Sequence, residues 1–262
     1  MKIIACIKQV PDSEAKVKAE NGKVSWGESP LVINPFDEYA VEGALQQKET
    51  QSGASSSLST VTALCIGPES AKEALKHALA MGADDAILIS DPILENIDTL
   101  GAARILAAAI QKIGGVDMVV FGRQTLDNGA GITPAQTARV LGWPMLGLVG
   151  QIKVQDGSVS VERVIEEGRQ NVSAKLPAVL SVVQGIGEPR YPSFMGIRKA
   201  SKANIPVWSL SDAGISAPEP VVKRAELMNP PVQDTSIEII SGETPAEIAD
   251  KLADKILAEK VL

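Results

Sequence analysis

The sequence of 262 residues predicts an α/β fold with a doubly wound, mostly parallel sheet, an antiparallel addition, and an extended C-terminal arm that ends in a helix. Three observations predict it. Short apolar runs alternate with alanine-rich helical stretches as far as residue 142, and this β-α alternation forms parallel sheets with right-handed crossovers. Aromatic residues make up only 3% of the chain, so β-branched strands and alanine-rich helices must fill the core. Beyond residue 143, turn residues and prolines become frequent.

The first 142 residues carry four pairs of strand and helix. Strands are expected over 2–7, 58–66, 86–90 and 116–121, where the apolar runs are too short for helices. Helices are expected over 38–51, 69–81 and 99–112 and from residue 132, with Asp98 as an N-cap and Gly82 as a C-cap. The stretch 9–30 is polar, and we expect it to be irregular.

After Trp143 the pattern changes to strands joined by turns. Residues 149–154 and 159–165 flank Asp156-Gly157 and predict a hairpin, and further strand is expected over 170–183, interrupted by the sequence Lys-Leu-Pro. These strands fit an antiparallel addition to the sheet.

The chain is expected to divide near residue 206. Residues 1–206 form the α/β domain, whose last part, about 184–205, is rich in glycine, proline and basic residues. Residues 207–262 form an arm, because prolines interrupt 217–234 before an amphipathic helix over 245–259, whose apolar face is formed by Ile248, Leu252, Ile256 and Leu257. A long segment with no core of its own before a terminal helix is typical of an arm that packs on another subunit.

Charge and composition argue against several classes. A net charge of −7 and a pI near 4.9 argue against a nucleic-acid partner, which is bound through a basic surface. No apolar run approaches the roughly 20 residues of a membrane span, and the chain opens on a strand, so we expect neither membrane insertion nor an export segment. Cys6 and Cys65 lie in apolar runs and are expected to be reduced thiols, which favours a cytoplasmic location. His77 lies in a helical stretch, and no catalytic set can be assembled around it.

The stretch 116–136 has the outline of an anion site. A buried strand ends at Gly122, a polar turn contains Gly129 and Gly131, and a helix begins near Ile132 with Pro134 in its first turn. Glycines let the backbone approach a ligand, and the first amides of a helix point where a phosphate would sit. The stretch matches neither the G-x-G-x-x-G fingerprint nor the P-loop. A plain connection between strand and helix is the alternative interpretation.

The carboxyl ends of the other strands define the rest of the expected site. Ligands of doubly wound sheets bind beyond these ends, which selects residues 6–10, 65–68 and 122 onward. Asn34 and Asp37 precede or begin a helix. They are expected either to cap it or to border the same ligand.

Motifs spread along the chain resemble those of a known family. The run 161–172 contains Val161, Arg163, Glu166-Glu167-Gly168 and Gln170, and Pro177 follows before the apolar Val179-Leu180. Together with Cys6-Ile-Lys8-Gln-Val-Pro-Asp12, Asn34-Pro-Phe-Asp37, Ala78-Leu-Ala-Met-Gly-Ala-Asp84, Leu141-Gly-Trp-Pro144 and Glu188-Pro-Arg-Tyr191, this pattern is similar to the β subunit of electron transfer flavoproteins over nearly the whole chain.

The resemblance implies a heterodimer with an adenine-nucleotide-binding, Rossmann-like domain in this subunit. The α subunit would hold most of a redox FAD, and this chain would hold AMP or, as in electron-bifurcating members that oxidise NADH, a second FAD. The family often has acidic or polar residues where this chain has Gly129, Ala130 and Ile132. The implied cofactor-binding residues are Cys6, Asn34, Pro35, Phe36, Asp37, Ile66, Gly122, Thr125, Leu126, Asp127, Asn128, Gly129, Ala130, Gly131, Ile132, Thr133, Pro134, Ala135 and Gln136.

The function that the resemblance implies is electron carriage, without catalysis by this subunit, from flavin dehydrogenases to an ETF-quinone oxidoreductase or an equivalent acceptor. Partner recognition is expected in residues 184–205, at Glu188, Arg190, Tyr191, Phe194, Lys199 and Lys202. Two alternatives remain open. An ATP-binding enzyme would need a phosphate-facing lysine and metal-binding acids, yet Asp127 is the only acid between Gly122 and Gln136. The other alternative is a scaffold with a vestigial site.

Overall fold

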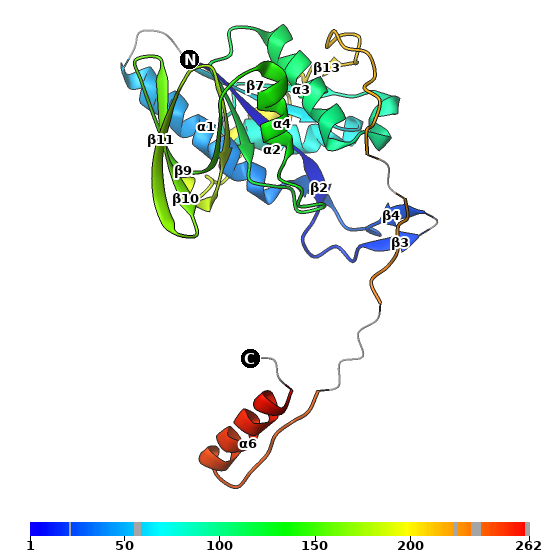
Figure 1. Cartoon of the computed structure of the whole chain (residues 1–262). Helices are drawn as coiled ribbons and strands as arrows, with labels where there is room; N and C mark the ends of the chain where they lie inside the picture. Colours follow the sequence, from blue (N-terminus) through cyan, green and yellow to red (C-terminus); the bar gives the residue numbers. More distant parts are fainter. Residues whose placement is uncertain (21, 55–58, 223–224, 232–236, 260–262) are drawn as a thin grey trace. The chain divides into compact units, whose positions relative to one another are not determined.

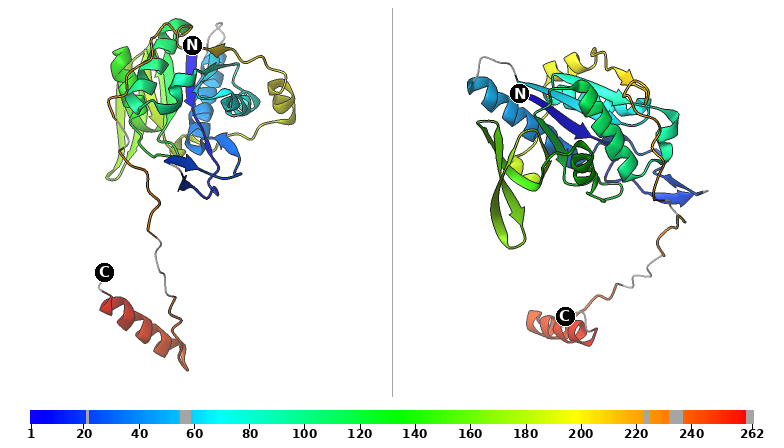
Figure 2. Two further views of the ribbon diagram at one scale, coloured as in Figure 1. Left: turned by 90° about the vertical axis from the view of Figure 1, so that its right-hand side faces the viewer. Right: turned by 45° about the horizontal axis from the view of Figure 1, so that its top comes forward.

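The computed structural model describes residues 1–20, 22–54, 59–222, 225–231 and 237–259, in two compact units, Met1–Leu227 and Met228–Leu262. The first unit is a sheet with helices on both faces (Figures 1 and 2). Its strands are, in spatial order, β11 (Gly168–Lys175), β10 (Ser158–Ile165), β9 (Met145–Gln155), β12 (Ala178–Val182), β8 (Met118–Gly122), β1 (Lys2–Ile7), β6 (Thr60–Ile66), β7 (Asp85–Ile89) and β13 (Val207–Trp208).

Strand β1 lies in the interior of the sheet, between β8 and β6, and shows why the fold needs two helix layers. Ile3 and Ala5 are fully buried on the face covered by α1 (Pro35–Ala54) and α2 (Lys72–Met81). Ile4 is fully buried on the opposite face, covered by α3 (Thr99–Ile113) and α4 (Thr133–Leu141). A strand that is apolar on both sides cannot face water, so the helices alternate between faces. The predicted doubly wound α/β fold is therefore confirmed.

The sheet extends differently from the sequence-based expectation at two places. Strand β12 pairs in parallel with β8 and also with β9, so it separates β8 from the antiparallel ladder β9-β10-β11. The stretch 9–30 contains short pairs in place of an irregular loop: β2 (Gln9–Pro11) with β5 (Leu31–Ile33), and β3 (Lys18–Glu20) with β4 (Lys23–Ser25). Residue 58, the first of the strand expected over 58–66, lies outside the described ranges.

Residues 184–205, whose glycine and proline content suggests a loop, contain a 3₁₀ turn (Gln184–Ile186) and the helix α5 (Phe194–Ala200). The Ser193 hydroxyl caps α5 by accepting a hydrogen bond from the amide of Gly196 at 2.9 Å. Gly196 lies so close to α2 that an added Cβ would come within 2.3 Å of the Ala80 carbonyl oxygen. A capping serine and a glycine contact thus override the proline and glycine content that suggested a loop.

The first compact unit also extends past residue 206, where the arm was expected to start. Strand β13 pairs with β7, and Leu210 and Ala213 are buried. The ring of Trp208 lies under Lys112 Nζ, 4.4 Å from the ring centroid, and the amides of Val221 and Val222 donate to Asp98. Residues 223–224 and 232–236 of the expected arm lie outside the described residues.

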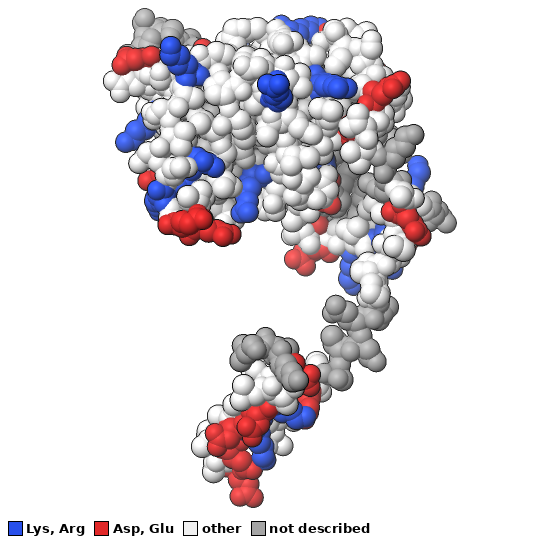
Figure 3. Space-filling view, viewed as in Figure 1, with Lys and Arg blue, Asp and Glu red and all other residues white. Residues whose placement is uncertain are grey.

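The second unit contains the helix α6 (Pro245–Ala258), which confirms the predicted terminal helix. Thr244 caps it by accepting from the Glu247 amide at 3.2 Å. None of its residues is buried, and Leu252 and Leu257 are exposed. The face of α6 that Figure 3 shows carries several acidic and basic side chains. None of the helices in the described ranges is long and apolar enough to cross a membrane.

Candidate functional site

The loop between β8 and α4, residues 122–132, which we call the glycine loop, begins at a position that admits only glycine. A Cβ at Gly122 would lie 2.5 Å from Asp37 Oδ1 and 2.5 Å from the Phe36 carbonyl oxygen. Gly129 and Gly131 have φ angles of +61° and +63°, which side-chain-bearing residues rarely adopt. The three glycines therefore set the path of the loop.

Asn34 fastens the glycine loop to the turn before α1. Its side chain is fully buried, and its Nδ2 donates to the Gln124 carbonyl at 2.9 Å while its Oδ1 accepts from the Leu126 amide at 3.1 Å. The expected alternative, capping of α1 by this side chain, is not what the structure shows. Asn34 therefore supports the loop.

Asp37 joins the same turn to the end of β1. Its Oδ2 accepts a hydrogen bond from the Lys8 amide at 2.8 Å, and its side chain is buried. Burial raises the pKa of Asp37 to about 7, although hydrogen bonds from Asn34 and from the Lys8 amide favour the ionised form.

The tip of the glycine loop is ordered by its own polar groups. Thr125 Oγ1 donates to Asn128 Oδ1 at 2.9 Å, and the Ala130 amide donates to the same oxygen at 3.2 Å. Lys8 Nζ forms an ion pair with Asp127. Burial raises the pKa of Asp127, but the hydrogen bond from Lys8 and its charge outweigh burial, and the pKa lies below its ordinary value.

The N-terminus of α4 follows the glycine loop and offers amides to an anion. Ile132, the residue before the helix, has helical backbone angles and no side-chain capping bond. The amides of Thr133 and Ala135 precede the first intrahelical bond, which the Gln136 amide donates to the Ile132 carbonyl at 3.0 Å. Pro134 has no amide hydrogen. The first amides of α4 therefore have no intrahelical partner, which is the arrangement that binds anions at helix N-termini.

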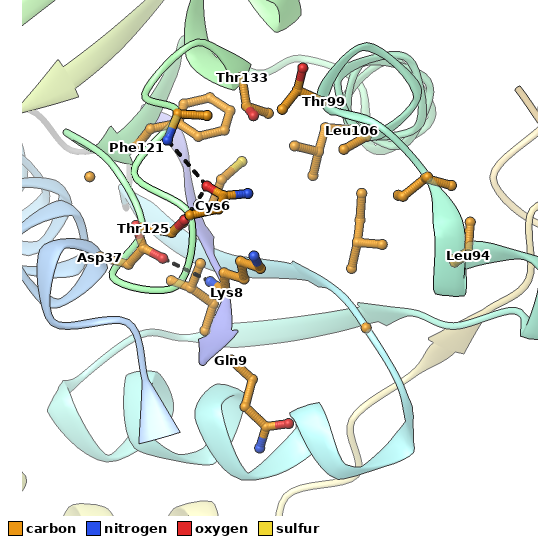
Figure 4. Close-up of a pocket in the computed structure, with 18 of the residues that line it drawn as sticks. Cys6, Lys8, Gln9, Asp37, Leu94, Thr99, Leu106, Phe121, Thr125 and Thr133 are labelled. Atoms are coloured by element: carbon orange, nitrogen blue, oxygen red, sulfur yellow. Dashed lines mark hydrogen bonds between the residues drawn. The ribbon is translucent and has the colours of Figure 1, made fainter. Parts of the chain in front are cut away.

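These elements surround a cavity of about 790 Å³ at the carboxyl ends of β1, β6, β7 and β8, a volume typical of small-molecule sites (Figure 4). The glycine loop and β1 form its polar side, and Leu94 and Leu106 lie on the opposite side. Of the expected cofactor-binding residues, the cavity wall contains Cys6, Asp37, Ile66, Gly122, Thr125, Asn128, Ala130, Gly131, Thr133 and Pro134.

The other expected residues do not line this cavity. Asn34 and Phe36 act behind the glycine loop, and Asp127 pairs with Lys8 at its edge. The full set outside the cavity wall is Asn34, Pro35, Phe36, Leu126, Asp127, Gly129, Ile132, Ala135 and Gln136.

Several cavity residues were missed by sequence reasoning. Some of them had a usable signal in the sequence. Ser90 and Asp91 follow β7, and ligands of parallel sheets bind beyond the carboxyl ends of such strands. Leu106 belongs to the apolar face of α3. Trp26, after β4, had no such signal, because only the folding of the 9–30 stretch brings it to the cavity. Lys8, Gln9, Pro68, Arg123 and Gln124 lie in the strand ends that the sequence selected, although they were not named as binding residues. The residues missed altogether include Trp26, Glu69, Ser90, Asp91, Leu94, Ile97, Thr99, Ala102 and Leu106.

The titratable groups of the cavity wall include the buried carboxyl of Asp37 and the buried thiol of Cys6. Burial raises the pKa of the Cys6 thiol well above its ordinary value, so Cys6 is a neutral thiol. His77 lies outside the cavity wall, with its Nε2 2.8 Å from Glu38 Oε1. Across the described ranges, no group of three or more His, Cys, Asp or Glu residues is placed to hold a metal ion.

A second surface contains the residues expected to recognise partners. Tyr191 and Phe194 are 95% and 80% exposed, and Glu188, Lys199 and Lys202 are exposed as well. Phe194 does not fold back onto the core. Arg190 differs, because its guanidinium is paired within the chain to Glu42 and Glu49.

Comparisons with known proteins show which family the chain belongs to. A family model described as "Electron transfer flavoprotein domain" matches residues 27–213. The chain is 34% identical to "Caffeyl-CoA reductase-Etf complex subunit CarD" of Acetobacterium woodii over the whole of both chains, and 32% identical to "Electron transfer flavoprotein subunit beta" of Megasphaera elsdenii over the whole of both. The β subunit of Mycobacterium leprae is 38% identical over 83% of this chain and 82% of its own. The chain therefore belongs to the β-subunit family of electron transfer flavoproteins.

Proposed function

We propose that this chain is the β subunit of a heterodimeric electron transfer flavoprotein that carries electrons from flavin-containing dehydrogenases to a quinone-linked oxidoreductase or an equivalent acceptor. The α subunit holds most of the FAD, which supplies the redox chemistry, and this chain is a carrier subunit and not an enzyme. Membership of the family supports the electron transfer role. We assign it to the cytoplasm because Cys6 and Cys65 are buried free thiols.

We further propose that the cavity beside the glycine loop holds AMP. The observation that carries this proposal is the uncapped N-terminus of α4, with Gly131 and Thr133 in the cavity wall. Backbone amides, the Thr133 hydroxyl and Lys8 are suited to a phosphate, and the apolar side near Leu94 and Leu106 is suited to a flat base. AMP in this position stabilises the subunit and takes no part in electron transfer.

A second FAD at the same site is the alternative, in which the heterodimer is a bifurcating form that oxidises NADH. The extent of the cavity favours it, since the wall continues from the glycine loop past Ile97 to the 3₁₀ turn at Leu94. A volume of about 790 Å³ lies in the upper part of the range for small-molecule pockets and leaves room for a ring system beyond a mononucleotide.

The proposed recognition surface consists of the exposed residues Tyr191, Phe194 and Met195 with Lys199 and Lys202 beside them. Such a cluster is suited to a partner pocket with acidic surroundings, because a large apolar side chain supplies affinity and the lysines steer association. Phe194→Ala is expected to cost about 1–3 kcal/mol of donor binding while the FAD content stays at one per heterodimer. An unchanged rate of FAD reduction by the donor dehydrogenase would argue against this surface.

The nucleotide proposal is tested by denaturing the purified heterodimer and separating the released nucleotides. One FAD with one AMP supports the carrier form. Two FADs support the bifurcating form, and FAD without any second nucleotide supports a vestigial site. Gly131→Val tests the location, because it should lower the second nucleotide and leave the FAD of the α subunit.

A further inference from the structure

Arg190 is anchored to α1 more firmly than the exposed residues that follow it. Its Nε donates to Glu42 Oε2 at 2.8 Å and its Nη2 to Glu42 Oε1 at 3.1 Å, which is a two-point pair. Its Nη1 donates to Glu49 Oε1 at 2.6 Å, and its backbone amide donates to Glu42 Oε2 at 3.2 Å. The planar fork of arginine fits two carboxylates in this way, and lysine cannot reproduce it.

The carboxylate of Glu42 depends on this contact. Its side chain is only 7% exposed, so removal of the guanidinium would leave a buried charge without its cation. Burial raises the pKa of Glu42, but the hydrogen bonds from Arg190 and Gln46 prevail, and the pKa lies below its ordinary value. The two carboxylates raise the pKa of Arg190, which is therefore always charged.

The backbone on both sides of Arg190 is also held. Before it, Gln46 Nε2 donates to the Ile186 carbonyl at 3.2 Å, and Ile186 packs so closely on Gly43 that an added Cβ there would lie 3.1 Å from its Cγ1. After it, Gly196 of α5 lies against the Ala80 carbonyl of α2. Residues 186–196 are thus fixed at both ends, and Arg190 holds the middle.

We propose that Arg190 is a positioning residue for docking of the donor dehydrogenase: it pairs with Glu42 and Glu49 and holds residues 187–193 so that Tyr191 and Phe194 are displayed in one arrangement. This inference rests on the proposed recognition role of that surface. It corrects the expectation that Arg190 itself recognises the partner, because all the donors described above point to α1. A surface that is ordered before binding loses less conformational entropy on docking, so the pairing of Arg190 with Glu42 and Glu49 strengthens association without adding a contact to the partner.

The test compares Arg190→Gln with Lys48→Ala in the full heterodimer. Lys48 is a matched control, since it also lies on α1 and ties it through an ion pair to a different segment, the turn before β7, with Nζ 2.6 Å from Asp84 Oδ1. Hydrogen exchange over residues 187–200 is measured first. Arg190→Gln should speed exchange there by about tenfold or more, and Lys48→Ala should leave it unchanged.

The second readout is reduction of the bound FAD by a flavin dehydrogenase that reduces the wild-type heterodimer. Arg190→Gln should raise KM for the heterodimer by about tenfold with kcat within twofold, and Arg190→Lys should fall between it and wild type. Glu49→Gln gives a milder variant, because it removes one carboxylate without unpairing the buried Glu42; it should raise KM by about threefold.

The outcomes separate the two levels of inference. The positioning role is overturned if hydrogen exchange over 187–200 in Arg190→Gln matches that of wild type. It is also overturned if KM rises as much in Lys48→Ala as in Arg190→Gln. If Phe194→Ala retains the wild-type KM, the recognition surface itself is wrong. If Arg190→Gln does not assemble with the α subunit, Glu49→Gln tests the positioning role of Arg190 in its place. Faster hydrogen exchange over 187–200 with a raised KM supports that role, and wild-type values for both measurements overturn it.

Discussion

Replacement of Asn34 by alanine tests whether this residue organises the nucleotide site from behind. The change removes the bond from Nδ2 to the Gln124 carbonyl and the bond from the Leu126 amide to Oδ1, at 2.9 and 3.1 Å. It also removes the hydrogen bond from Asn34 to Asp37, but it changes no atom of the cavity-wall residues Gly122, Gly131 and Thr133. Any loss of loop order therefore comes from support and not from ligand contact.

The magnitude follows from the burial of the side chain. Asn34 is fully buried, so water does not replace its bonds unless the loop opens. Each bond contributes about 0.5–1.5 kcal/mol net, and an unpaired buried partner costs about 1–3 kcal/mol, so a total of roughly 2–4 kcal/mol is expected. At 1.4 kcal/mol per factor of ten, local opening should become about 30- to 1,000-fold more frequent.

Hydrogen exchange at the Leu126 amide, read by mass spectrometry of peptides covering 122–132, measures this opening directly in the heterodimer. Asn128→Ala is the matched control: it also removes two hydrogen bonds from the same loop, but its side chain is exposed and water can replace them. An unchanged rate at Leu126 in Asn34→Ala, or an equal rise in Asn128→Ala, would refute the supporting role.

Four further outcomes are expected. Gly131→Val should reduce retained AMP, because φ at this residue is +63° and the added Cβ would lie 3.2 Å from the Arg123 carbonyl oxygen. The control Gly157→Val, which is equally strained at φ +71° but lies in a remote turn, should retain AMP; nucleotide analysis of both variants checks this. Burial raises the pKa of Asp37 to about 7 from 3.8, so between these two values the folded chain keeps a proton that the unfolded chain releases. The free energy of unfolding in urea should therefore rise as pH falls from 7 toward 4, and Asp37→Asn should reduce this dependence on pH. Trp26 lines the cavity, so AMP added to stripped heterodimer should change tryptophan fluorescence in wild type and not in Trp26→Phe. Removal of the chain from Met228 should leave unit 1 folded by circular dichroism but unable to co-purify the α subunit, since α6 has no buried residue in this chain.

The central sheet and the glycine loop were predictable because their signals are local. A buried strand ending in Gly122, positive-φ glycines and an uncapped helix start lie within one stretch of sequence. The parallel placement of β12 beside β8 was not, because nothing near Val179 indicates which distant strand it pairs with. Antiparallel hairpins are decided by their turns, whereas parallel pairs are decided by packing across the whole sheet.

The roles of single residues were harder to predict than their proximity to the site. The sequence left open whether Asn34 and Asp37 cap a helix or border the ligand, and only the folded geometry separates Asn34, which supports the loop, from Asp37, which lines the cavity. Trp26 reaches the cavity through a hairpin whose register local composition does not specify. Arg190 has the charge expected of a partner contact, and only the position of Glu42, 148 residues earlier, directs it inward.

The nucleotide content of the purified heterodimer tests the central claim most directly. Denaturation, separation of the released nucleotides and quantification against protein should give one FAD and one AMP per heterodimer, with the AMP lost and the FAD kept in Gly131→Val. Two FADs per heterodimer, or a preparation in which Gly131→Val retains its AMP, would contradict the claim that this cavity holds AMP.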